Sequence, residues 1–127
     1  MSSLLVRLAL LLLVLAFPLG AQAQEVEQSA GLVCDTITQI EQFVSLHNQK
    51  VSNSDALVKV NGDKTPPACD VVIVAFYRGK VEKSVMTDGV VVEITAILVV
   101  GAYDGQQWIR TVPTPQYTIF RTKDRGA

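Results

Sequence analysis

The sequence predicts an α+β fold in which one main N-terminal helix and a short second helix pack on an antiparallel meander of four to five strands. Three observations carry this prediction. Apolar residues recur every three or four positions over residues 35–50, as in an amphipathic helix. From residue 70 the period changes to two, as in half-buried strands. Asp-Gly pairs at 88–89 and 104–105 then mark hairpin turns. A small SH3-like β-barrel with a helical extension is the alternative fold.

Residues 1–23 carry the features of a secretory signal peptide. Arg7 supplies a positive charge, residues 8–17 form an unbroken apolar run, and the Ala-Gln-Ala of residues 21–23 offers a cleavage site. A run of ten residues is short for a membrane span, which needs about 20. We therefore expect a periplasmic or secreted protein with no stable membrane span after cleavage.

The rest of the chain has the length of one domain. Removal of 23 of the 127 residues leaves 104, with 10 basic and 12 acidic side chains and a net charge of −2. We expect a flexible N-terminal arm over residues 24–33, a single domain over residues 34–121 and a charged tail over residues 122–127. The near-neutral charge and the lack of a basic cluster argue against nucleic acid as a partner.

Cys34 and Cys69 are the only cysteines in the chain. An exported chain meets an oxidising compartment, where an even pair of cysteines indicates a disulfide. The bridge would close a loop of about 35 residues, which the chain-entropy model values at about 4 kcal/mol.

The predicted main helix spans residues 35–50, with an apolar stripe that includes Ile40 and Phe43. Its N-terminus can be capped by Asp35, or by a capping box between Thr36 and Gln39. Residues 54–61 form a predicted second, short helix, for which a strand is the alternative.

Five strands are predicted after the second cysteine. They are separated by a turn at Gly79, by the two Asp-Gly turns, and by a break at Pro113 and Pro115, because proline cannot donate to a strand ladder. Their ranges are 70–78, 81–87, 90–101, 108–112 and 116–121. Two-residue turns place one set of apolar side chains on a common core face: Val72, Val74, Phe76, Val81, Val85, Val92, Ile94, Ala96, Leu98, Val100 and Ile109.

The second face of the sheet is also partly apolar, with Trp108 expected opposite Gly101. Three outcomes are open: the sheet closes into a barrel, other elements cover this face, or it remains exposed for contact. For the exposed case we expect a protein partner or a homodimer. The predicted binding surface comprises Ile97, Val99, Tyr103, Trp108 and Val112.

Residues with catalytic chemistry are sparse. His47 is the only histidine and lies near the predicted helix end, so no metal site and no cofactor are expected. Glu82 and Glu93 are predicted to share the polar part of the second face, where paired carboxylates could do acid–base work.

The functions that remain are a non-enzymatic binding or accessory module, a structural cell-envelope protein and, least favoured, a small hydrolase or lyase that uses Glu82 and Glu93.

The layout resembles small exported bacterial proteins of uncharacterised function. The resemblance is carried by the signal peptide, a cysteine that opens a helix (Cys34), the ALVKVN segment at residues 56–61, and a second cysteine that opens a strand (Cys69). It implies bacterial export and a disulfide, and it carries no activity.

Overall fold

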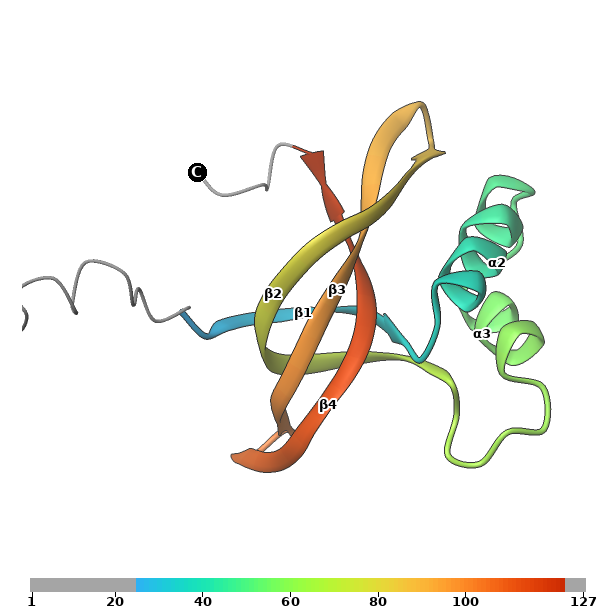
Figure 1. Cartoon of the computed structure of the whole chain (residues 1–127). Coiled ribbons are helices and arrows are strands. Elements are labelled where there is room, and N and C mark those ends of the chain that lie inside the picture. The colour runs from blue at the N-terminus through green and yellow to red at the C-terminus, as the bar shows by residue number, and fades with distance from the viewer. Residues whose placement is uncertain (1–24, 123–127) are drawn as a thin grey trace, which may run out of the picture.

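The structure, a computed structural model, describes residues 25–122. The described chain contains two helices and four strands (Figure 1), in the order β1 (Glu27–Cys34), α2 (Ile37–Asn48), α3 (Asn53–Asn61), β2 (Cys69–Thr87), β3 (Val90–Tyr103) and β4 (Trp108–Arg121). The strands are antiparallel and close into a barrel in the order β1-β2-β3-β4, while α2 and α3 lie together outside it. The α+β class is confirmed, and the sheet takes the barrel form of the alternative. The predicted signal peptide lies outside the described residues.

Both predicted helices form. The capping box of α2 is present: the Gln39 backbone N–H donates to Thr36 Oγ1 at 3.3 Å, and the Thr36 backbone N–H donates to Gln39 Oε1 at 2.9 Å. The shorter helix, α3, is capped by Ser52, whose Oγ accepts from the Asp55 backbone N–H at 3.2 Å.

The predicted flexible arm is wrong over most of its length. Residues 27–34 form β1, which pairs with β2 without a break from Glu27–Phe76 to Cys34–Cys69. The main helix is therefore not the first element, and Cys34 ends a strand instead of opening a helix. The predicted Cys34–Cys69 disulfide is confirmed, and it joins residues that face each other directly across two strands.

The predicted turn at Gly79 is wrong, because β2 continues through it for 19 residues in total. A Cβ atom at Gly79 would lie 2.7 Å from the carbonyl oxygen of Ala96. The register with β3 shifts before Gly79, between Ala75 and Phe76, across it, between Arg78 and Val81, and after it, between Val81 and Lys83. Glycine at this position therefore allows β2 to bend and the backbone of β3 to come close to it.

The predicted break at the two prolines is also wrong. Pro113 and Pro115 lie inside β4, which runs for 14 residues. They are tolerated because β1 pairs with β4 only at Val33–Thr118 and Cys34–Tyr117, so the proline part of β4 has a strand on one side only.

The hairpin turn at Asp88 and Gly89 is confirmed, with φ of 49° and 74° and with Thr87 opposite Val90. The second Asp-Gly pair behaves differently. Trp108 faces Tyr103, not Gly101, so the loop has four residues, 104–107. The Asp104 carboxylate accepts from the backbone N–H groups of Gln106 and Gln107 at 2.8 and 2.9 Å, which holds the wider loop.

Both faces of the sheet bury apolar side chains, so the single core face predicted from the turns is wrong. Leu98, Ile109 and Val81 were assigned to it, yet they are 37, 46 and 41% exposed. Each bulge adds an unpaired residue and inverts the faces beyond it. Val74 and Phe76 therefore pack inside the barrel with Ile97 and Val99.

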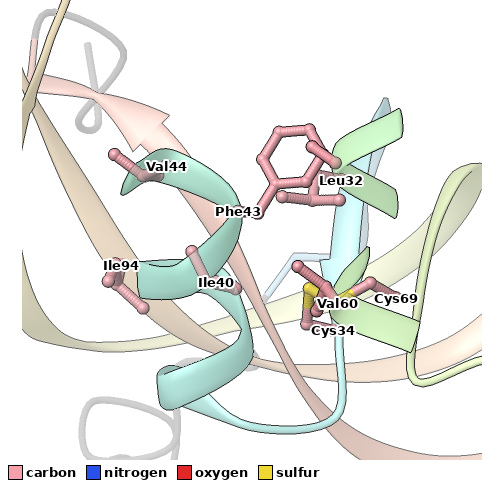
Figure 2. Close-up of a cluster of buried hydrophobic side chains, with 9 residues drawn as sticks. Leu32, Cys34, Ile40, Phe43, Val44, Val60, Cys69 and Ile94 are labelled. Carbon is pink, nitrogen blue, oxygen red and sulfur yellow. A yellow bond between two sulfur atoms is a disulfide. The ribbon is translucent and has the colours of Figure 1, made fainter. Parts of the chain in front are cut away.

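The second cluster lies between the helices and the outside of the barrel (Figure 2). Ile40, Phe43 and Val44 of α2 join Ile94 of β3 and the disulfide in this cluster. Its buried members are Leu32, Cys34, Ile40, Phe43, Val44, Ala56, Val60, Cys69 and Ile94. Within residues 25–122, no helix is both long enough and apolar enough to cross a membrane.

Candidate binding groove

The structure divides the predicted binding surface. Ile97 and Val99 are 4 and 7% exposed and pack inside the barrel, so assigning them to a contact surface was wrong. Trp108 and Val112 are 42 and 81% exposed. The rings of Tyr103 and Trp108 lie 5.4 Å apart across the base of the β3–β4 loop. A partner or a second copy could use only these three side chains of the predicted surface.

The structure also separates the two predicted carboxylates. Glu93 is 2% exposed and pairs with Ser84 in the β2–β3 register. Glu82 falls at a register shift and lies on the outside, 4.0 Å from the Lys80 ammonium. The prediction that Glu82 and Glu93 share a polar face of the sheet is therefore wrong.

A groove opens where α2, the β2–β3 turn and the end of β4 meet. Its volume is about 290 Å³. The α2 stripe supplies one wall, because Phe43, Val44 and His47 follow at spacings of one and three residues on a helix. The complete lining is Phe43, Val44, His47, Asn53, Thr87, Asp88, Val92, Ile119, Phe120 and Arg121. Five of the lining residues are apolar and five are polar or charged; we call the apolar group the floor and the polar group the rim of the groove.

His47 joins three elements at the rim of this groove. Its Nε2 lies 2.8 Å from Asp88 Oδ2 in the hairpin turn, and its Nδ1 lies 3.2 Å from Asn53 Oδ1 at the start of α3. Both partners are oxygen acceptors, so the doubly protonated imidazolium donates to both, whereas a neutral ring can donate to only one.

The pKa values of this pair follow from the same contacts. The hydrogen bond to Asp88, with a smaller contribution from Asn53, raises the pKa of His47 above 6.5. The hydrogen bond from His47 lowers the pKa of Asp88 below 3.8. Between these values the pair is an ion pair at the protein surface.

Two further contacts attach α2 to the β2–β3 hairpin. The Asn48 side-chain amide donates to the Met86 carbonyl oxygen at 3.0 Å, and the Lys83 ammonium lies 2.8 Å from the Glu41 carboxylate. Together with the His47–Asp88 pair, they hold the hairpin beside the helix and keep that side of the groove in place.

A second hollow of about 380 Å³ adjoins the groove and shares His47, Asn53 and Asp88 with it. Lys50 lines this hollow. In the part of the chain that the structure describes, neither Lys50 nor Arg121 makes an ion pair.

The polar groups around the groove are hydrogen-bonded to one another. Both nitrogens of His47 are occupied by Asp88 and Asn53, which leaves none to activate a nucleophile. The nearby Ser52 hydroxyl caps α3. Over residues 25–122, no three or more His, Cys, Asp or Glu side chains gather as metal ligands would.

Sequence reasoning placed His47 at the helix end but missed its partners and the groove. Glu41, the acidic residue of α2, is paired with Lys83. The true partner, Asp88, is 41 residues further along the chain. The only signal available was that His47 continues the apolar stripe of the helix, which places it against the sheet.

Comparison of the chain with models of known families, with curated proteins and with solved structures found no match.

Proposed function

We propose that the protein is an exported, non-enzymatic binding module that takes an apolar group into the groove between α2 and the barrel. The observation that carries this proposal is the groove itself, about 290 Å³ in volume, with five apolar residues in its lining. Small-molecule sites are typically concave and mostly apolar with a few polar groups at defined positions, and they begin at about 300 Å³. Those five residues are Phe43, Val44, Val92, Ile119 and Phe120. The ring of Phe120 also packs against Phe76 in the barrel, with 5.9 Å between the ring centroids.

Export is part of the proposal. The sequence pattern of residues 1–23 favours it, and the Cys34–Cys69 disulfide is compatible with an oxidising compartment.

The experiment is a titration of the exported, oxidised protein with N-phenyl-1-naphthylamine, an uncharged apolar fluorophore. We expect a saturable fluorescence increase with one site per chain. Thr87→Trp places a bulky ring at the groove rim and should abolish the increase, because Thr87 lines the groove. Met86→Trp is the matched control, since Met86 is the preceding residue of β2, points to the other face and is 56% exposed.

Circular dichroism of both variants verifies that they fold. Saturable binding that is lost in Thr87→Trp and retained in Met86→Trp supports the groove as the site. Equal binding by both variants, or no saturable binding to the unmodified protein, contradicts the proposal.

A further inference from the structure

We infer that the ligand of this groove is an amphiphile with a single anionic head group, whose tail lies on the apolar floor and whose head lies at the basic rim. This inference rests on the proposed function and specifies its ligand class.

The floor of the groove selects an apolar tail. The side chains of Phe43, Val44, Val92, Ile119 and Phe120 carry no hydrogen-bonding group, so a polar group there would lose its water without compensation. Phe43 and Val44 also belong to the core cluster between the helices and the sheet. The apolar surface of the groove therefore continues directly from the protein core.

The rim selects the charge of the head group. Arg121 and His47 line the groove, and Lys50 lines the hollow next to it. Among the described residues, Asp88 is the only acidic one that lines either of them, and its carboxylate is hydrogen-bonded to His47 at 2.8 Å. With His47 neutral the rim carries one net positive charge, and with His47 protonated it carries two. The chain as a whole has a net charge of −1, so this excess is local.

These charged groups come from every element that borders the opening. Helix α2 brings His47, and Lys50 follows it. The β2–β3 turn brings Asp88, the end of β4 brings Arg121, and α3 contributes the uncharged Asn53. Arg121 and Lys50 make no ion pair among the described residues, so an anion can bind them without breaking one. A cationic head group would meet repulsion from both.

The test compares three ligands with the same decyl tail: decanesulfonate, decanol and decyltrimethylammonium. Each is used to displace N-phenyl-1-naphthylamine at low salt, below the concentration at which it forms micelles. Decanesulfonate should displace the probe at about one tenth of the decanol concentration, because one charge-assisted contact is worth about that factor. Decyltrimethylammonium should displace the probe only at a higher concentration than decanol does.

Two arginine variants then locate the head group. Arg121→Gln should raise the decanesulfonate concentration required by about tenfold and leave decanol unchanged, since it removes the charge-assisted contact. Arg110→Gln is the matched control, because Arg110 is an exposed residue of the same strand that does not line the groove. Arg110→Gln should change the displacing concentration of neither decanesulfonate nor decanol.

The outcomes separate this inference from the proposed function. Equal displacement by the sulfonate and the alcohol, or preference for the ammonium, overturns the anionic head group and leaves an apolar binding groove. An Arg121→Gln variant that binds decanesulfonate like the Arg110→Gln control also overturns it. No saturable binding of the probe, and no binding of decanesulfonate measured directly by calorimetry, contradicts the proposed function and this inference together.

Discussion

The Nε2 atom of His47 lies 2.8 Å from Oδ2 of Asp88, and this hydrogen bond connects the last turn of α2 to the tip of a hairpin 41 residues later in the chain. The contact sits at the rim of the groove and involves groups that are 35 and 59% exposed at the side chain. It therefore contributes to the local arrangement of helix and hairpin more than to the core.

This pair should make stability depend on pH. The pKa of His47 is raised on folding, so its contribution is fully present below 6.5 and is lost as pH rises through the folded value. The pKa of Asp88 is lowered, so its contribution is present above 3.8 and is lost as pH falls through the folded value. The pair thus stabilises the fold most between these two values.

His47→Gln should accordingly reduce the free energy of unfolding more at about pH 5 than at about pH 9, as measured by urea denaturation. Asp88→Asn should show the same pattern, because asparagine tolerates the positive φ of 49° while losing the charge. A loss that is identical at the two pH values for both variants would show that the pair is not an ion pair.

Gly79→Ala should lower the free energy of unfolding by about 1–3 kcal/mol, the usual cost of overpacking. The new Cβ atom would lie 2.7 Å from the carbonyl oxygen of Ala96, so the backbone of β2 or β3 must move. Gly31→Ala is the control, since no atom lies within 4 Å of its Cβ position. Thermal denaturation that places both variants at the same midpoint would contradict the bend at Gly79.

Reduction of the Cys34–Cys69 disulfide should lower the free energy of unfolding by about 2–4 kcal/mol, because the reduced unfolded chain regains the entropy of a long loop. Urea denaturation with and without reductant measures this change. A Cys34→Ala/Cys69→Ala variant should be insensitive to reductant and should match the reduced protein. An unchanged midpoint on reduction would contradict this contribution.

Trp108→Ala should lower the free energy of unfolding by about 1 kcal/mol and leave the protein folded. The Trp108 ring packs on Tyr103, with 5.4 Å between the ring centroids, but it remains 42% exposed. Val112→Ala, at 81% exposure, should change stability by less than about 0.5 kcal/mol. Unfolding of Trp108→Ala, measured by circular dichroism, would show that the ring belongs to the core.

Local signals predicted the parts of the fold that local chemistry determines. The capping residues Thr36 and Gln39 define the start of α2, and the Asp88-Gly89 pair defines its hairpin because its positive φ values suit few other residues. The expectation of export and an even cysteine count were enough to predict the disulfide.

The features that the sequence did not predict depend on contacts between residues that are far apart in the chain. The polar residues at the start of β1 gain their strand conformation from pairing with β2, some 50 positions later in the chain. The bulges near Gly79 depend on the approach of Ala96 and reverse which side chains are buried. The groove was missed for the same reason, because its walls come from α2, the β2–β3 turn and the end of β4.

The measurement that tests the central claim most directly is methyl NMR of the oxidised protein during titration with N-phenyl-1-naphthylamine. We predict saturable shifts of the methyl signals of Val44, Val92 and Ile119, which line the groove, and unchanged methyl signals of Val112, which does not. Shifts that gather around Trp108 and Val112, with the groove methyl groups unaffected, would contradict the account and return the binding site to the β3–β4 hairpin.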